Sequence, residues 1–204
     1  EDLLTPTLHP RGGYLAFLGR ISPEKRVDRA IAIARAAGLP LKIAAKVDHA
    51  DEAYFTREIA PLLSQPGIEF IGEIDEQQKG TFLGQARALL FPIDWPEPFG
   101  LVMIEAMACG TPVLAFRQGS APEVVEDGIT GYVVESMEEA IGKIGRVMAL
   151  DRGRVRRRFE QRFTADRMAR DYLNLYRRLL GIRMREPAPP AARHIREPDA
   201  AASA

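Results

Sequence analysis

The sequence is poor in several features that would each indicate a particular class of protein. Cys109 is the single cysteine among 204 residues, which excludes a disulfide within them and fits a reducing compartment. We therefore expect a cytoplasmic location. Lysine and arginine number 28, as do aspartate and glutamate, and this balance gives no indication of a nucleic-acid partner. No apolar run approaches about 18 residues, so we expect no membrane-spanning helix.

Motifs for cofactor and metal chemistry are also missing. The sequence has no G-x-G-x-x-G, which leaves little support for a nicotinamide-dependent dehydrogenase. It has no Asp-x-Asp pair, which argues against a divalent metal that bridges a diphosphate. The three histidines, His9, His49 and His194, have no metal-ligand spacing around them. We therefore expect neither a cofactor nor a metal site.

Composition divides the chain into three parts. Residues 1–12 are typical of a linker, and we expect an N-terminal portion ahead of them. Residues 13–181 carry the regular apolar pattern of a folded domain. Residues 182–204 are rich in proline, alanine and charge with little to bury, and they predict a disordered tail.

The folded part alternates between short apolar runs and amphipathic segments. Six runs predict strands, at residues 13–19, 41–47, 68–72, 88–93, 112–116 and 131–135. The segments between them predict helices, at residues 23–37, 51–65, 76–86, 99–109 and 120–128, and two or three more between 137 and 180. Ser22 is expected to cap the first helix, and Pro61 to disturb the second.

Strands separated by helices predict an α/β fold, a doubly wound parallel sheet of Rossmann-like type with helices on both faces. In such sheets, ligands bind beyond the carboxyl ends of the strands. Two loops with unusual chemistry, "GRISPEK" and "WPEPFG", leave from predicted strand ends of this kind.

Two cations follow the first predicted strand in "GRISPEK". Arg20 and Lys25 flank a turn that opens a helix, and a helix N-terminus adds unpaired N–H groups and a partial positive charge. Together they would hold two negative oxygens, for example those of a diphosphate. The alternative interpretation is that both are solvated surface charges beside Glu24 and Arg26.

The second candidate lies in "WPEPFGLVMIEAMACGTPV". Pro98 and Gly100 permit a sharp turn and a close approach of the backbone to a ligand at a helix start. The helix that follows is apolar almost all round, which predicts a core helix, and Glu105 is its only charge. A carboxylate there needs exposure at a cleft or hydroxyl donors, and a ribose would supply two. Glu97 lies before the helix, where an ordinary loop acid is an equally good interpretation.

Two other features have ordinary structural interpretations. The basic run from Arg152 to Arg158 is typical of a solvated helix face, and peripheral contact with the inner membrane face is the alternative. Trp95 is expected to pack its loop onto the domain rather than to cover a ligand, and Cys109 to be a small buried side chain.

Three blocks of the sequence resemble a known family. "GRISPEK", followed about seventy residues later by "EPFGLVMIEAMACGTPV" and then by "GSAPEVVEDGITGYVV", is similar to the C-terminal nucleotide-sugar-binding domain of retaining glycosyltransferases of the GT-B fold, family 4. R-x4-K alone is a weak signal, whereas E-x7-E within E-P-F-G-L-x-x-x-E-A-M-A-x-G-x-P-V is a strong one. The likeness covers residues 13 to 180.

The resemblance implies a metal-independent transferase that uses a nucleotide-diphosphate sugar and retains the anomeric configuration. It also implies roles at matching positions. Arg20 and Lys25 would contact the donor diphosphate, Glu97 would bind hydroxyls of the donor sugar, and Glu105 would accept from the ribose. Arg20, Lys25 and Glu97 are the candidate catalytic residues. Further donor contacts would come from Gly19, Ile74, Phe99, Gly100, Leu101 and Val102, with Ile74 in the base-contacting "GEID" segment.

The resemblance also defines what lies outside this half. In the GT-B fold, the N-terminal domain carries most acceptor contacts, so the isolated domain is expected to be inactive. The alternatives are a nucleotide-sugar-binding module without transferase activity and half of a sugar-nucleotide epimerase. Many relatives have a glycine-rich turn after the second strand, whereas this chain has "IAAKVDHADEAYF", so Lys46 and Asp48 are expected to reshape that rim. The residues leave the sugar, the base and the acceptor open.

Overall fold

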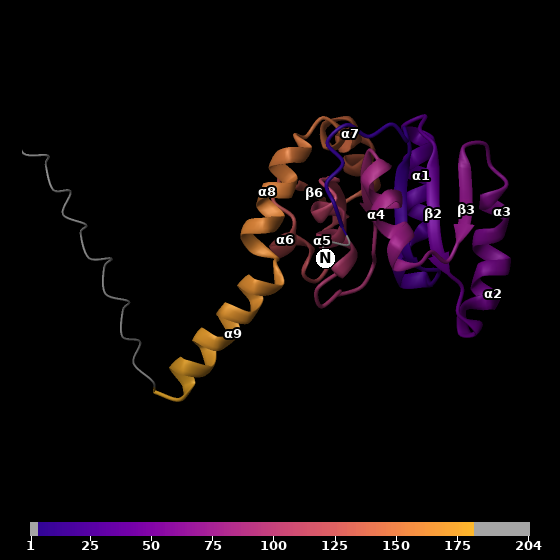
Figure 1. The fold of residues 1–204 in the computed structure, drawn as a ribbon. Helices are drawn as coiled ribbons and strands as arrows, with labels where there is room; N and C mark the ends of the chain where they lie inside the picture. The colour runs from indigo at the N-terminus through magenta and orange to yellow at the C-terminus, as the bar shows by residue number, and fades with distance from the viewer. Residues whose placement is uncertain (1–3, 182–204) are drawn as a thin grey trace, which may run out of the picture. The chain divides into compact units, whose positions relative to one another are not determined.

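The computed structural model describes residues 4–181 and confirms the predicted α/β fold (Figure 1). Six parallel strands form one sheet in the order β3-β2-β1-β4-β5-β6. The strands are β1 (Leu15–Arg20), β2 (Leu41–Lys46), β3 (Ile68–Gly72), β4 (Ala88–Phe91), β5 (Val113–Phe116) and β6 (Gly131–Val134). The chain adds strands outward from β1 in one direction and then outward from β4 in the other. The order therefore reverses between β1 and β4, where doubly wound sheets bind their ligands.

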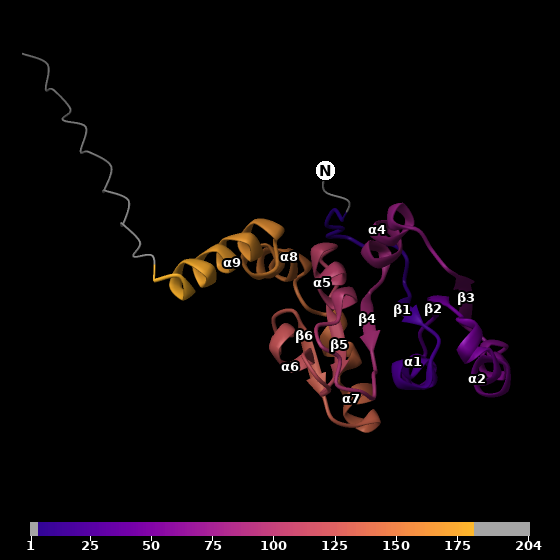
Figure 2. The ribbon, with the colours of Figure 1, turned by 90° about the horizontal axis from the view of Figure 1, so that it is seen from below.

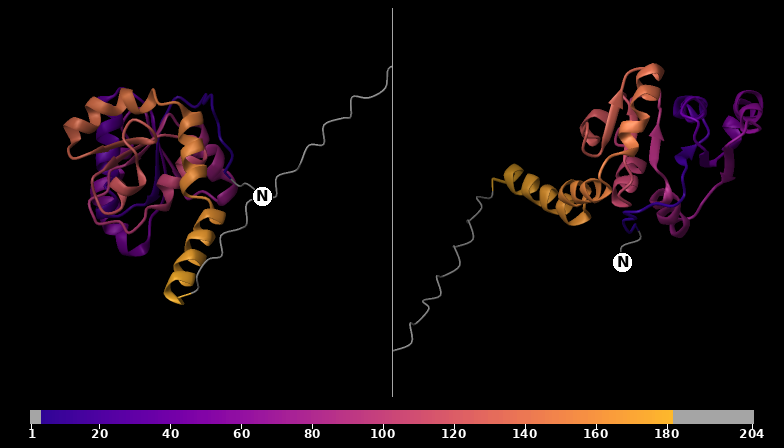
Figure 3. Two further views of the ribbon diagram at one scale, coloured as in Figure 1. Left: turned by 90° about the vertical axis from the view of Figure 1, so that its left-hand side faces the viewer. Right: turned by 90° about the horizontal axis from the view of Figure 1, so that it is seen from above.

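Helices cover both faces of this sheet (Figures 2 and 3). One face carries α1 (Val27–Ala36), α7 (Met137–Met148) and the segment α2 (Glu52–Tyr54), η3 (Phe55–Ile59) and α3 (Ala60–Leu63). The other carries α4 (Glu76–Gln85), α5 (Leu101–Ala108), α6 (Ala121–Val124) and α8 (Arg152–Arg162). Short helical turns, η1 (Pro23–Lys25) and η2 (His49–Asp51), follow β1 and β2.

The strands at the centre are buried on both faces, which explains their unbroken apolar sequence. Successive side chains of a strand point to opposite faces of the sheet. In β5, Val113 and Ala115 join the core with α5, while Leu114 and Phe116 join the core with α1 and α7. Both cores consist of buried, mostly apolar side chains, so a central strand needs no polar face.

The first helix begins later than the sequence predicts. Ser22 precedes η1 and its side chain accepts no capping hydrogen bond. Arg26 then adopts a left-handed conformation, with φ 52°, and α1 starts only at Val27. A non-glycine residue with positive φ is costly unless its surroundings hold it. The turn that carries Lys25 is therefore separate from α1.

The predicted disturbance at Pro61 is confirmed, and its form is a π-helical turn. Residues Phe55–Ile59 form this turn, and the N–H of Ala60 donates to the carbonyl of Phe55. Proline has no N–H to offer to the carbonyl four residues before it, so the turn ahead of Pro61 widens and the helix continues as α3.

The chain divides into two units, of which the second begins at Ala165. Within it, α9 (Ala165–Leu179) is amphipathic, with exposed apolar side chains that include Met168, Tyr172 and Leu179. The tail predicted at 182–204 lies outside the described residues. Within residues 4–181, no helix is both long and apolar enough to cross a membrane.

The start of α8 holds the N-terminal segment and two helix ends together through Arg152. This arginine is only 9% exposed. Its guanidinium donates to the carbonyl oxygens of Gly84 (2.8 Å) and Ala86 (2.8 Å) at the end of α4, and to that of Thr7 (2.6 Å). It also donates to the hydroxyl of Thr111, 2.6 Å away, just beyond α5. Burial lowers its pKa to about 10, which leaves it charged at neutral pH.

The basic run of α8 therefore differs from the solvated face that the sequence predicts. Arg156 donates to the carbonyl oxygens of Leu4 (2.9 Å) and Ala108 (2.6 Å). Arg158 forms a bidentate pair with Glu126. Arg152, Arg156 and Arg158 are thus held by contacts within the domain, whereas Arg154 and Arg157 are exposed.

Replacing Arg152 with methionine is expected to lower the free energy of unfolding by roughly 3 kcal/mol, because buried carbonyl oxygens lose a charged donor. The matched control is Arg154→Met on the same helix, where the side chain is exposed and a change within about 0.5 kcal/mol is expected. Urea unfolding followed by circular dichroism measures both variants. Equal stability of the two would contradict the role assigned to Arg152.

Candidate functional site

A cavity of about 450 Å³ opens at the carboxyl ends of β1 and β4, where the strand order reverses. All the predicted site residues except Ile74 and Glu105 line it. They are Gly19 and Arg20 at the end of β1, Lys25 in η1, and Glu97, Phe99, Gly100, Leu101 and Val102 at the start of α5. Segments more than seventy residues apart in the sequence thus meet at one place, because parallel strands end at the same edge.

Gly100 forms the turn that starts α5. Its φ is 75°, in the left-handed region that suits glycine. A Cβ at this position would lie 2.6 Å from the Cε of Met103 and 3.1 Å from the ring of Phe91, so a larger residue would also require these buried side chains to shift. The turn brings the unpaired N–H groups at the start of α5 to the cavity wall, where they favour an anion.

Glu97 is held from two sides. Lys25 donates to its Oε2, and the indole Nε1 of Trp95 donates to the same oxygen at 3.0 Å. The Lys25 ammonium also lies over the Trp95 ring, 5.4 Å from its centroid. The side chains of Lys25 and Glu97 are 19% and 16% exposed. Trp95 is 37% exposed and contacts both members of the Lys25–Glu97 pair, so it orients an acid of the cavity.

Arg20 is more exposed and more loosely held. It pairs with Asp48 at 3.3 Å and with Glu24 at 3.4 Å, and half of its side chain is exposed. Hydrogen bonds from Lys46 first and Arg20 second hold the pKa of Asp48 below its usual value. The segment after β2 thus contributes a carboxylate to this rim of the cavity, where Lys46 and Asp48 were expected to alter it. Exposed pairs of this length contribute little free energy, so a ligand can displace them.

Glu105 has a partner that the sequence pattern did not indicate. Its Oε1 accepts from the Lys79 ammonium at 2.9 Å, and Lys79 also pairs with Glu76 at 2.7 Å. Burial lowers the pKa of Lys79, but the two carboxylates more than offset this and raise it. Glu105 is 23% exposed and lies one turn beyond Leu101 on α5. Ile74 precedes α4 and packs against the core beneath α5.

Sequence reasoning also missed a network that connects the two loops of the cavity. Asp94 accepts from Arg26 at 2.9 Å and from Arg29 at 3.0 Å, and its N–H donates to the carbonyl of Glu24 at 2.8 Å. Arg26 also forms a bidentate pair with Asp28. The sequence offered no signal for this network. It includes Arg26, whose left-handed backbone conformation is not predicted by its residue type.

The loop after β5 holds the backbone around Glu97 in place through hydrogen bonds. The N–H of Ser120 donates to the carbonyl of Glu97 at 2.9 Å, and its hydroxyl donates to the carbonyl of Phe99 at 2.8 Å. A Cβ at Gly119 would lie 2.3 Å from the Glu97 carbonyl, so only glycine permits this approach. The "GSAPEVVEDG" block therefore positions the cavity wall.

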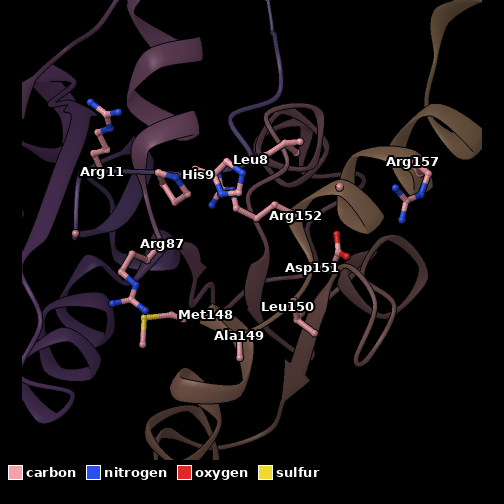
Figure 4. A pocket seen from close by; sticks show the side chains of 13 residues that line it. Leu8, His9, Arg11, Arg87, Met148, Ala149, Leu150, Asp151, Arg152 and Arg157 are labelled. Atoms are coloured by element: carbon pink, nitrogen blue, oxygen red, sulfur yellow. The ribbon is translucent and has the colours of Figure 1, made fainter.

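A second cavity, of about 710 Å³, lies near the amino ends of the strands (Figure 4). His9 and Arg11 from the N-terminal segment line it, together with Arg87 before β4 and the turn between α7 and α8. None of the predicted site residues lines it. Within residues 4–181, no group of three or more His, Cys, Asp or Glu side chains could hold a metal ion.

The chemistry of the 450 Å³ cavity follows from its charges. Two cations and the N-terminus of α5 lie on its walls, and each cation is paired with a carboxylate. A group with two or more negative oxygens could replace those carboxylates as the partner of both cations. Glu97 would then present an acceptor for hydroxyl groups beside that anion.

Comparison with known proteins identifies the family. The model for glycosyl transferases group 1 matches residues 7–164. D-inositol 3-phosphate glycosyltransferases of Mycobacterium bovis and Mycobacterium tuberculosis are 34% identical over 182 residues, which cover 82% of this chain. The chain spans 37% of the length of these relatives.

Solved structures agree with this match. AviGT4, a glycosyltransferase involved in avilamycin A biosynthesis, is 28% identical with a TM-score of 0.72, over 85% of this chain and 53% of its own. Sucrose-phosphate synthase from Thermosynechococcus elongatus is 25% identical with a TM-score of 0.73, over 89% of this chain and 51% of its own. The fold also matches HepE of Anabaena, solved with UDP and glucose, at 21% identity and a TM-score of 0.67, over 81% of this chain and 48% of its own. The predicted Rossmann-like fold of GT-B glycosyltransferases is confirmed, and the chain belongs to the glycosyl transferases group 1 family.

Proposed function

We propose that this chain is the C-terminal, donor-binding domain of a family 4 retaining glycosyltransferase. The observation that carries the proposal is the convergence of Arg20, Lys25, Glu97 and the N-terminus of α5 on one cavity at the strand switch point. In this arrangement the two cations and the helix N-terminus bind the diphosphate, Glu97 binds hydroxyls of the sugar, and Glu105 binds the ribose. The backbone from Phe99 to Val102 and at Gly19 and Ile74 supplies the remaining donor contacts.

The donor assignment has support from the similar proteins as a group. HepE was solved with UDP and with UDP-glucose, which are donor-type ligands. The names D-inositol 3-phosphate glycosyltransferase and sucrose-phosphate synthase indicate different overall reactions. Proteins with different reactions that share this half are expected to share what the half binds. We infer that the shared ligand is a nucleotide-diphosphate sugar.

The proposed mechanism is electrostatic. When the bond between the anomeric carbon and the β-phosphate oxygen breaks, negative charge accumulates on the leaving diphosphate. Arg20, Lys25 and the N–H groups at Gly100 and Leu101 stabilise that charge without a metal ion or cofactor. The acceptor hydroxyl oxygen bonds to the anomeric carbon with retention of configuration, and its proton passes to the oxygen of the departing diphosphate. Donors that are already in place at the cavity wall require little rearrangement as the charge develops.

The acceptor is proposed to bind mainly to an N-terminal domain of a longer protein. The curated relatives are longer than this chain, which spans 37% of their length. We therefore propose that the 204-residue chain alone binds donor without turning it over, as a module without transferase activity would. A cytoplasmic enzyme with peripheral contact at the inner membrane face remains our proposal for location.

A ligand panel tests the proposal on this chain. Uridine, guanosine and adenosine diphosphates and their sugar derivatives are added, and the melting temperature is measured, because a ligand of the folded state raises it by mass action. At least one nucleoside diphosphate is expected to stabilise the chain, also in the presence of EDTA. No stabilisation by any of them would reject donor binding, and stabilisation abolished by EDTA would reject metal independence.

Arg20→Ala and Lys25→Ala are each expected to weaken binding of the nucleoside diphosphate by about 10- to 100-fold, because each removes a charged donor to the diphosphate. In the two-domain enzyme, kcat/KM for the donor should fall on the order of 10²-fold. Isothermal titration and steady-state kinetics measure these effects.

The control for Arg20→Ala is Arg117→Ala. Arg117 follows β5 and is 51% exposed, against 52% for Arg20, but it does not line the cavity. Its removal is expected to leave diphosphate affinity within two-fold of the unchanged chain, an estimate based on the weak energetics of exposed ion pairs, roughly 0–1 kcal/mol. Equal losses in both variants would show that general positive charge, and not the site, attracts the ligand.

Glu105→Ala is expected to weaken binding of ribonucleoside diphosphates by about tenfold, since a carboxylate acceptor for two hydroxyl groups is lost. Inorganic diphosphate, which has no ribose, should bind this variant as well as the unchanged chain. Calorimetric titration of both ligands separates the two effects. Unchanged affinity for the ribonucleotide would reject the ribose role of Glu105.

A further inference from the structure

Lys79 provides the charge that balances Glu105. Its ammonium lies 2.9 Å from Oε1 of Glu105, and the two side chains are 14% and 23% exposed. The pair bridges α4 and α5, and Glu105 is the only charged residue of α5. A partly buried carboxylate is stabilised by a charged partner, and here that partner is a lysine 26 positions earlier in the chain.

The position of Lys79 is fixed by the packing of α4 on α5. The next residue, Gly80, accepts a hydrogen bond from the thiol of Cys109 at 3.7 Å. One turn further, the carbonyl of Leu83 accepts from the hydroxyl of Thr111 at 2.7 Å. Both contacts connect α4 to the end of α5. The Lys79 backbone therefore stays in place when its side chain loses a partner.

Glu105 does not line the cavity itself, but it shares a face of α5 with two residues that do. Leu101 and Val102 line the cavity, and Glu105 follows them by four and three residues, which places it on the same face of the helix. Only its Oε1 has a hydrogen-bond donor among residues 4–181, and that donor is Lys79. Its second oxygen, Oε2, is left to accept from another group.

We propose that Lys79 is a positioning residue that makes the site select ribonucleotides. By holding Oε1, Lys79 fixes the orientation of the carboxylate and leaves Oε2 for the ribose hydroxyl groups. This inference rests on the proposed function, in which Glu105 contacts the ribose. Without Lys79, the Glu105 carboxylate is ordered only when the ligand binds. The side-chain entropy lost at that step lowers the affinity.

Glu76 offers a matched control because it also pairs with Lys79, at 2.7 Å. Its side chain is 69% exposed and it lies one turn before Lys79 on the same helix. Exposed pairs at this spacing contribute little. If Lys79 affected nucleotide binding only through its net charge or through the stability of α4, removing Glu76 would change the affinity as much as removing the contact with Glu105.

The experiment compares a ribonucleoside diphosphate with its 2′,3′-dideoxy analogue by calorimetry, with uridine, guanosine and adenosine diphosphates as probes. The unchanged chain is expected to prefer the ribonucleotide by about tenfold or more, because a site built for hydroxyl groups rejects a ligand that lacks them. In Lys79→Met the preference should fall to within about two-fold, while affinity for the dideoxy analogue stays nearly constant. Lys79→Arg should restore part of the preference, and Glu76→Gln should keep all of it.

The outcomes separate this inference from the proposed function. If the unchanged chain has the preference and Lys79→Met retains it, Lys79 does not position Glu105 and the inference is wrong. Equal weakening of both ligands in Lys79→Met would also overturn it, since that result indicates a purely structural ion pair. If the unchanged chain binds the nucleotide without any preference, the ribose role of Glu105 is wrong and the inference falls with it. Lys79→Gln repeats the comparison should Lys79→Met fail to fold.

Discussion

The burial of α5 between the sheet and the neighbouring helices is the constraint on which the site depends. Met103, Ala106 and Met107 are fully buried, so the helix has one position relative to β4 and β5. Its first turn then places unpaired N–H groups at the cavity wall, and its middle carries Glu105. A helix packed loosely at the surface could not position its first turn and Glu105 as accurately as the recognition of a ligand requires.

The two ends of α5 are secured by different means. At the N-terminus, Gly100 turns the chain against Phe91 and Met103, so the approach to the helix is fixed by contact with the core. At the C-terminus, Arg156 donates to the carbonyl of Ala108 at 2.6 Å, and Arg152 donates to that of Cys109 at 3.5 Å. The arginine run of α8 thereby contributes to the site from a distance. It stabilises the end of the helix opposite to the cavity.

Patterns of apolar residues predicted the fold and the common edge at which the two loops meet, because both follow from local rules and from the parallel order of the strands. The resemblance carried by "GRISPEK" and "EPFGLVMIE" implied which residues of those loops would line the site. The contacts between charged residues followed no such rule. Lys79 reaches Glu105 and Asp48 reaches Arg20 because separate elements happen to pack side by side, and many pairings were equally consistent with the sequence. The left-handed turn at Arg26 was missed because propensity alone argues against it.

The network around Asp94 shows why such contacts matter for a site built on loops. Glu97 lies outside any helix or strand, so nothing in the regular structure fixes its distance from Lys25. Asp94 connects the two loops through its N–H to Glu24 and through its carboxylate to Arg26. The unfavourable backbone of Arg26 is compatible with this network, since its side chain forms ion pairs with both Asp28 and Asp94. The sheet determines where each loop begins, and these long-range contacts determine the positions of the charged side chains that the loops carry.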